Sequence, residues 1–351
     1  MMLRESARFG KGASLRHDGR HAVRQGTNLR EVWVVTDGRP GNEGPALALA
    51  RALEAHGWAP AEIRRATPRP GPARLPAMAW AAAPAREGGW PFSALEDRGA
   101  GLARPWPELV ISAGRRSAPV AAAMRRLSGG ATRAVQILNP GMRLLSFDAV
   151  IVPRHDRLRG DTVIETLGSL SRVTPELAAA EASLWSAALA RLPQPRLAVL
   201  VGGPSRSARW SPTLTMRLVE ALEQATAKGW GIMATLSRRS PEGLNLALRR
   251  AAPRAYIWDG AGANPYPGIL GLASAALVTA DSVNMASEAA SAGVPVHVLG
   301  MDGLSPKLQR FHEELARAGA SREWDGRLLT WQVQPLAQAE AAAAALAARL
   351  G

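Results

Sequence analysis

The sequence contains no cysteine, which excludes disulfide bonds, thiolate nucleophiles and cysteine-ligated metal sites. Its histidines are few, and none of them shows the paired helical spacing typical of a zinc enzyme. We therefore expect no metal site and no bound cofactor. The six histidines are His17, His21, His56, His155, His297 and His312.

Long apolar runs are absent as well. Arg, Glu, Pro or Gly interrupts every candidate before the roughly 20 residues needed to span a bilayer. Residues 1–30 carry seven Lys and Arg but lack the apolar centre of a secretory signal, so we expect a basic, disordered tail. This tail is either a dispensable extension or a contact with an anionic membrane. The expected location is cytoplasmic, with peripheral attachment to the inner face of the cytoplasmic membrane as the alternative.

Aromatic residues are scarce, with two Tyr and four Phe, although the net charge is +14. A basic surface attracts nucleic acids, anionic lipids and phosphorylated metabolites alike. The sequence lacks the aromatic and basic repeats that bind single strands. We therefore expect no nucleic-acid partner, and the oligomeric state stays open.

From residue 31 onward, short β-rich runs alternate with Ala- and Leu-rich stretches of helical length. This alternation and the length of 351 residues predict an α/β protein with two Rossmann-like, doubly wound domains that face each other across a cleft. We expect the domains to span 31–192 and 196–334, with a boundary at Pro193-Gln194-Pro195. A final helix over 335–351 lacks its own strand and is predicted to pack back on the first domain. The expected strands are 32–36, 109–112, 134–138, 149–152, 163–167, 197–201, 231–236, 255–258, 276–279 and 294–299.

One segment, 67–107, interrupts the alternation. It is rich in Pro, Gly and Ala and carries Trp80, Trp90, Phe92 and Trp106. Long irregular insertions are usually either functional or disordered. The tryptophans either reach a lipid interface or an acceptor site, or they pack on the flank of the domain.

Turns at the ends of the first-domain strands contain candidate ligand-binding residues. Ligands of open parallel sheets gather at the carboxyl ends of strands, where backbone amides and helix N-termini favour anions. Neither a dinucleotide fingerprint nor a Walker loop is present. Arginine can hold phosphate or carboxylate through two parallel hydrogen bonds. The candidates on this side, which we assign to an acceptor, are Gly38, Gly41, Asn42, Gly114 and Arg115.

The second half has turns that suit a diphosphate and a ribose. Two neighbouring strands end in glycine or hydroxyl residues beside arginine, a combination that can hold a diphosphate. A helix beginning near residue 282 brings Met285 and Glu288 onto nearby parts of its first two turns, and the carboxylate could accept hydrogen bonds from two ribose hydroxyls. Surface exposure for Glu288 and helix capping for Asp281 are the alternatives. The candidates are Gly202, Gly203, Ser205, Arg206, Ser237, Arg238, Asp259, Asn264, Asp281, Ser282, Met285 and Glu288.

These motifs together resemble the mitochondrial fission family named after the plant elongated-mitochondria protein. The family is similar to GT-B glycosyltransferases, which need no metal. The resemblance implies that the second domain binds a nucleotide-sugar and that the first binds an acceptor, lipid-linked or at a membrane surface. It places Gly202, Gly203, Ser205 and Arg238 at the diphosphate and Glu288 at the ribose. The matching stretches are TDGRPGN (36–42), PELVISAGRRSAPV (107–120), VQILNP (135–140), FDAVIVPRHD (147–156), VGGPSR (201–206), TLSRR (235–239), WDGAGANPY (258–266), VTADSVNMASEAASAGVPV (278–296) and SPKLQRFH (305–312).

The catalytic base is where the sequence departs from the lipid-intermediate transferases. Those enzymes place a histidine in their first glycine-rich turn, whereas this chain has Asp37 and Asn42 there. Asp37 is one candidate base, and His155 beside Asp156 is the other. Two further functions stay open. The plant member recruits a dynamin-related GTPase, which implies a non-catalytic adaptor, and some nucleotide-sugar epimerases also use two facing domains, although their expected acidic pair is not evident.

Overall fold

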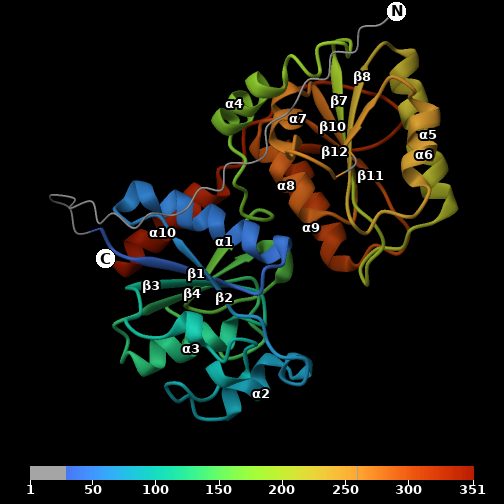
Figure 1. Cartoon of the computed structure of the whole chain (residues 1–351). Coiled ribbons are helices and arrows are strands. Elements are labelled where there is room, and N and C mark those ends of the chain that lie inside the picture. Colours follow the sequence, from blue (N-terminus) through green and yellow to red (C-terminus); the bar gives the residue numbers. More distant parts are fainter. Residues whose placement is uncertain (1–28, 259) are drawn as a thin grey trace, which may run out of the picture.

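The computed structural model describes residues 29–258 and 260–351, so most of the predicted basic tail and Asp259 lie outside the described residues. Two parallel six-stranded sheets form the centres of two α/β domains, as the alternation predicts (Figure 1). The first sheet has the order β2-β1-β3-β4-β5-β6, and the second has the order β12-β11-β10-β7-β8-β9.

In the first domain, α1 and the C-terminal α10 cover one face of the sheet and α3 covers the other (Figure 1). Its elements are β1 (Val32–Thr36), α1 (Pro40–Leu53), β2 (Glu62–Arg65), α2 (Ala77–Ala82), β3 (Leu109–Ala113), α3 (Ala118–Leu127), β4 (Arg133–Ile137), β5 (Ala149–Pro153), β6 (Val163–Thr166) and the returning α10 (Gln338–Leu350).

In the second domain, α5 and α6 cover one face of the sheet, while α8 and α9 lie toward the first domain (Figure 1). Its elements are α4 (Pro175–Trp185), β7 (Arg196–Val201), α5 (Pro212–Ala227), β8 (Gly231–Leu236), α6 (Leu244–Ala251), β9 (Tyr256–Trp258), α7 (Tyr266–Leu272), β10 (Ala275–Thr279), α8 (Val283–Ser291), β11 (Val296–Leu299), α9 (Pro306–Arg317) and β12 (Ser321–Glu323).

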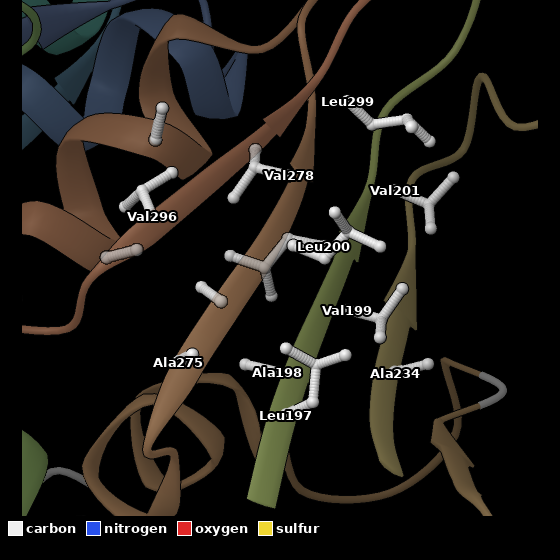
Figure 2. Packing of buried hydrophobic residues seen from close by; sticks show 14 of the residues in the cluster. Leu197, Ala198, Val199, Leu200, Val201, Ala234, Ala275, Val278, Val296 and Leu299 are labelled. Carbon is white, nitrogen blue, oxygen red and sulfur yellow. The ribbon is translucent and has the colours of Figure 1, made fainter. Parts of the chain in front are cut away.

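Strand β7 shows why the apolar runs form central strands. It lies between β10 and β8, and its residues 197–201 are fully buried with Val278 and Ala234 on the neighbouring strands (Figure 2). A strand covered by helices on both faces needs a continuous apolar run rather than an alternating one. The ten expected strands are all present within one or two residues of their predicted bounds. The two edge strands that we did not expect, β2 and β12, carry the polar sequences EIRR and SRE.

The helix before the Pro193-Gln194-Pro195 boundary packs on the second domain, whereas we expected it in the first. Helix α4 lies against α7, where a Cβ on Gly271 would come within 2.0 Å of the Ala178 carbonyl oxygen. Only glycine permits this close approach of the two helices. The chain therefore crosses between the domains before α4, and it crosses back before α10, which packs on α1.

The insertion at 67–107 folds onto the flank of the first domain. Trp80 and Phe92 are buried in the core beside α3. The indole nitrogens of Trp80, Trp90 and Trp106 donate to the backbone carbonyls of Pro72, Trp80 and Leu102 at 3.1, 2.7 and 2.8 Å. Buried indoles need such partners. Of the two alternatives for the tryptophans, the structure therefore shows packing on the flank of the domain. No helix in the described part of the chain is long and apolar enough to cross a membrane.

Candidate functional site

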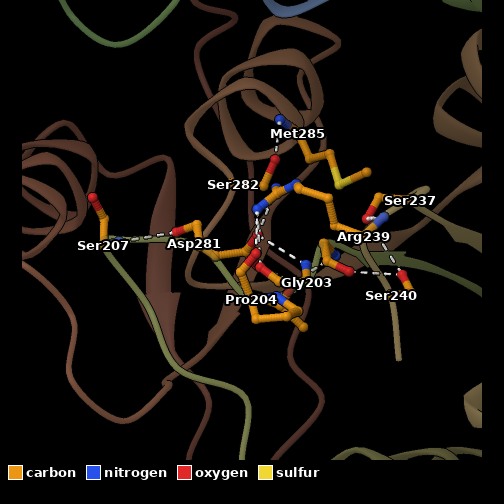
Figure 3. A network of polar contacts seen from close by, with 12 residues as sticks. Gly203, Pro204, Ser207, Ser237, Arg239, Ser240, Asp281, Ser282 and Met285 are labelled. Atoms are coloured by element: carbon orange, nitrogen blue, oxygen red, sulfur yellow. Dashed lines mark hydrogen bonds and ion pairs between the residues drawn. The ribbon is translucent and has the colours of Figure 1, made fainter. Parts of the chain in front are cut away.

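The turn after β7 is fixed by a buried carboxylate (Figure 3). Asp281 Oδ2 accepts from the Gly203 amide at 2.9 Å and pairs with Arg239 Nη2 at 2.9 Å. Its Oδ1 accepts from the Thr279 hydroxyl at 2.8 Å, and the Thr279 oxygen accepts from the Gly202 amide at 2.8 Å. The Asp281 side chain is fully buried. This carboxylate therefore holds the turn rather than facing the pocket.

The two glycines of this turn have a different role from the one we expected. We predicted that Gly202 and Gly203 would face a diphosphate, yet both amides already donate within the protein. A Cβ on Gly202 would come within 2.2 Å of Asp281 Oδ2, and one on Gly203 within 2.1 Å of the Arg239 carbonyl oxygen. The glycines are needed because the turn packs directly on these groups.

Arg239 also holds this turn, and the sequence did not lead us to predict it. It donates to the carbonyls of Gly203 and Pro204 at 3.0 and 3.3 Å, in addition to pairing with Asp281. Arg238, which we predicted, and Arg239 are both exposed, and the hydrogen bonds to the turn come from Arg239. The motif TLSRR placed an arginine here, but the adjacent pair did not indicate which of the two bonds to the turn.

The remaining second-domain candidates lie around the same strand ends. Ser282 caps α8, its hydroxyl accepting from the Met285 amide at 3.3 Å, and Met285 packs against the core. The Ser237 hydroxyl accepts from the Arg239 amide at 3.2 Å. Three further candidates, Ser205, Arg206 and Asn264, are exposed on the turns after β7 and β9.

Glu288 lies in the second turn of α8 and is only partly exposed. Burial raises the pKa of its carboxyl to about 7, while the Tyr266 hydroxyl and the Arg172 guanidinium act in the opposite direction. The same burial, together with the Glu288 charge, raises the pKa of Tyr266 well above its usual value. The buried Tyr266 hydroxyl makes no hydrogen bond of normal geometry in the described structure. A desolvated carboxylate with a raised pKa, close to the end of β10, is a candidate ligand-binding group.

In the first domain, the turns after β1 and β3 lie together. Asp37 Oδ1 accepts from Asn42 Nδ2 and from the Arg39 amide, both at 3.3 Å, and Asp37 Oδ2 has no hydrogen-bond partner among the described residues. A Cβ on Gly114 would meet Asn42 Nδ2 at 2.6 Å. The start of α1 also faces the start of α8, because a Cβ on Gly41 would lie 3.8 Å from Asn284 Nδ2.

His155, the other candidate base, is enclosed between the domains. It is 2% exposed and packs edge-on against Phe311 of α9, with ring centroids 5.3 Å apart. Burial lowers its pKa to about 4, Asp156 acts to raise it, and Lys307 and Arg310 lower it further. A neutral, covered imidazole of this kind is a weak base near neutral pH.

A pocket of about 360 Å³ joins the two domains beside His155. Arg115 and Asn139 line it from the first domain, and Lys307 and Arg310 line it from α9. We call it the α9 pocket. The stretch SPKLQRFH (305–312) is one of those that resemble the mitochondrial fission family, but we predicted no role for any of its residues. The available signal was a pair of cations three residues apart at the start of a helix.

Comparisons with known proteins agree with this architecture. Residues 40–350 match the model of the family described as Mitochondrial fission ELM1. Mitochondrial fission protein ELM1 of Arabidopsis thaliana is 32% identical over 259 residues, which cover 66% of this chain and 61% of the relative. An uncharacterised protein of Rickettsia prowazekii (strain Madrid E) is 24% identical over 55% of this chain and 64% of its own length. This chain thus spans less than two thirds of either relative.

Among solved structures, the UDP-GlcNAc 2-epimerase from Methanocaldococcus jannaschii superposes with a TM-score of 0.52 at 12% identity. The match covers 90% of this chain and 99% of the epimerase. A likeness at this identity shows the shared two-domain, GT-B-like fold. The family model matches most of the length of this chain, and this match shows more than the fold. This chain belongs to the mitochondrial fission ELM1 family.

Proposed function

We propose that this chain is a metal-independent GT-B-type glycosyltransferase that uses a nucleotide-diphosphate sugar, with an acceptor that is lipid-linked or at a membrane surface. The observation that carries the proposal is Glu288, a desolvated carboxylate on α8 beside the Tyr266 hydroxyl. Carboxyl ends of parallel strands are where such sheets bind ligands. In this role Glu288 accepts hydrogen bonds from the two ribose hydroxyls.

The diphosphate would lie between the start of α8 and the exposed side chains of Ser205 and Arg238. Helix N-termini stabilise anions, and the start of α8 lies near α1 of the first domain, where a Cβ on Gly41 would be 3.8 Å from Asn284 Nδ2. The amides of Gly202 and Gly203 are engaged by Thr279 and Asp281, so they take no part in this arrangement.

Asp37 is the base that this proposal favours over His155. The acceptor hydroxyl gives its proton to the Asp37 carboxylate. The acceptor oxygen then forms the bond to the anomeric carbon of the sugar, and the bond from that carbon to the diphosphate breaks. The nucleoside diphosphate leaves with the electron pair. His155 has the low pKa described above, so it is a weak base for this step.

Calorimetric titration with a panel of UDP-, GDP- and ADP-sugars tests the proposal. We expect one sugar nucleotide to bind the wild-type protein and Glu288→Gln to bind it about 10- to 100-fold more weakly, because a charged acceptor of two hydroxyls is lost. Glu220→Gln on the exposed face of α5 is the matched control and should bind like wild type. Folded protein that binds none of the panel would overturn the proposal.

A non-catalytic adaptor is the second candidate, favoured by the name of the Arabidopsis thaliana relative. Replacing Glu288 and Arg238 by Ala separates the two functions, since an adaptor would keep its cellular role in both variants. Incubating the bound nucleotide-sugar without acceptor and searching for an epimer separates the transferase from an epimerase.

A further inference from the structure

The α9 pocket carries more positive charge than the protein itself neutralises. Arg115, Lys307 and Arg310 line it, while Asp156 is its single carboxylate. Lys307 Nζ pairs with Asp156 at 2.5 Å, which leaves two guanidinium groups in excess. Unmatched cations in a cleft attract anionic ligands.

Both guanidinium groups retain hydrogen-bond donors. Arg115 has no hydrogen-bond or ion-pair partner among the described residues, and its aliphatic part lies against Gly141, whose added Cβ would meet it at 3.2 Å. Arg310 donates from Nη2 to the His155 carbonyl at 3.1 Å, whereas its Nε is buried without a partner. Leaving a buried charged donor unpaired is costly, so a ligand that accepts from it gains affinity.

The floor of the pocket is held rigidly. The fully buried Gln136 accepts from the Ser112 hydroxyl at 2.6 Å and donates to the carbonyls of Gly114 and Leu138 at 3.1 and 3.3 Å. Leu138 has a φ of 67°, a conformation that is uncommon for a residue other than glycine. These bonds fix the turns after β3 and β4 before any ligand arrives, which lowers the entropic cost of binding.

We propose that the α9 pocket binds the phosphate or diphosphate group of the acceptor, held jointly by Arg115 of the first domain and by Lys307 and Arg310 of the second. Two guanidinium groups and an ammonium suit the several oxygens of a diphosphate better than a single carboxylate. The buried His155 Nδ1 has no partner and offers one further polar contact. The N-terminus of α9, which carries Lys307, adds partial positive charge.

This inference rests on the proposed function, because the sugar nucleotide is assigned to Glu288 and α8 and the α9 pocket is left for the second substrate. It narrows that substrate to a phosphorylated acceptor. The phosphate could belong to a soluble sugar phosphate or to a lipid-linked diphosphate, which present the same chemistry to these residues.

Calorimetric titration with inorganic pyrophosphate at about 0.15 M salt tests the pocket, since salt screens the long-range attraction of the basic surface more than direct contacts. We expect Arg115→Gln and Arg310→Gln each to weaken binding at least about tenfold. Arg317→Gln removes the same charge from α9 at an exposed position and should bind like wild type. Equal affinity in wild type, Arg115→Gln and Arg310→Gln would overturn the proposal.

Arg310→Gln could disturb the contact between the domains and so weaken binding indirectly. Arg115→Gln avoids this problem, because Arg115 makes no hydrogen bond or ion pair with another residue in the described structure. A second titration separates this proposal from the proposed function. Glu288→Gln should keep its pyrophosphate affinity while losing the sugar nucleotide. If Glu288→Gln lost both, there would be one anion site at α8, and the α9 pocket would not be a separate site.

If no sugar nucleotide binds but the arginine variants still bind pyrophosphate more weakly than wild type, the α9 pocket is an anion site and the transferase proposal fails. Geranyl diphosphate and glucose 1-phosphate then distinguish the two sources of phosphate. Tighter binding of the first indicates a lipid-linked acceptor, and tighter binding of the second indicates a soluble one. Binding of either that is unchanged by Arg115→Gln contradicts the assignment.

Discussion

Two buried aspartates occupy similar places in the two domains, and they differ in what they bind. Asp281 follows β10 and uses both carboxylate oxygens on Gly203, Thr279 and Arg239. Asp37 follows β1 and makes two bonds of 3.3 Å through Oδ1, with Arg39 Nε as a looser ionic neighbour of Oδ2 at 3.4 Å. Both oxygens of the first carboxylate make hydrogen bonds, whereas Oδ2 of the second makes none among the described residues and has only the looser ionic contact with Arg39.

This difference teaches that a conspicuous motif at a strand end can serve stability rather than binding. The glycine-rich turn of the second domain looks like a phosphate loop, yet its amides and its aspartate satisfy one another. The less conspicuous turns of the first domain leave Arg115 and Asp37 Oδ2 without hydrogen-bond partners in the described structure. Chemistry in the cleft is expected to depend on these groups and on Glu288.

Replacement of Asp281 by Ala should have the largest effect on stability. It leaves the buried Gly203 amide and Thr279 hydroxyl without their acceptor, while the half-exposed Arg239 can be hydrated, so we expect the free energy of unfolding to fall by about 2–4 kcal/mol. Urea denaturation measures the change. The exposed pair of Asp325 and Arg327 provides the control, since Asp325→Ala should change stability by less than about 0.5 kcal/mol. A similarly small loss for Asp281→Ala would show that the turn is not held as described.

The pH dependence of stability should report Glu288. Its pKa rises to about 7 in the folded protein, so the folded state binds the proton more tightly than the unfolded state does. The wild type should therefore lose stability, relative to Glu288→Gln, as pH rises from about 4.5 through 7, by about 3 kcal/mol. Denaturation of both proteins at pH 5 and pH 8 measures the difference, and parallel behaviour would contradict the raised pKa.

Gly203→Ala tests the close packing of the same turn. Its Cβ would meet the Arg239 carbonyl oxygen at 2.1 Å, and the backbone would have to move. We expect a loss of about 1–3 kcal/mol by denaturation. Gly300→Ala is the control, because its Cβ would meet only Glu323 Oε1, at 3.6 Å. Equal effects of the two substitutions would argue against a rigid turn.

Asp37→Asn should have the smallest effect on stability, below about 1 kcal/mol, because its hydrogen bonds are long and the amide can keep one of them. If Asp37 is the base, the same substitution should lower the rate of sugar transfer by about 10²- to 10⁴-fold. Transfer at the wild-type rate would remove Asp37 from the mechanism. A stability loss as large as that of Asp281→Ala would erase the contrast between the two aspartates.

The sequence predicted the central strands because their apolar runs are required by burial on both faces. It missed β2 and β12, whose polar edge sequences carry little periodic signal. The placement of α4 depended on its packing against Gly271, 93 residues after Ala178, and chain order does not reveal that contact. The prolines at 193 and 195 therefore led us to place the domain boundary later than the point where the chain passes into the second domain.

The candidate site was predicted in a similar way. Strand-end turns could be located from local sequence, and Glu288 could be placed near the start of a helix. The pairing of Asp281 with Arg239, and the position of Lys307 and Arg310 against the first domain, arise from contacts between distant segments. Single-sequence patterns do not encode such contacts, so the saturation of the glycine turn was not foreseeable.

A crystal structure of the protein soaked with the sugar nucleotide that binds best would test the central claim most directly. We expect the ribose at Glu288, the diphosphate at the start of α8 and the sugar directed toward Asp37 across the cleft. A nucleotide bound away from Glu288 and α8, or a turn after β7 that opens to bind the diphosphate through the Gly202 and Gly203 amides, would contradict it.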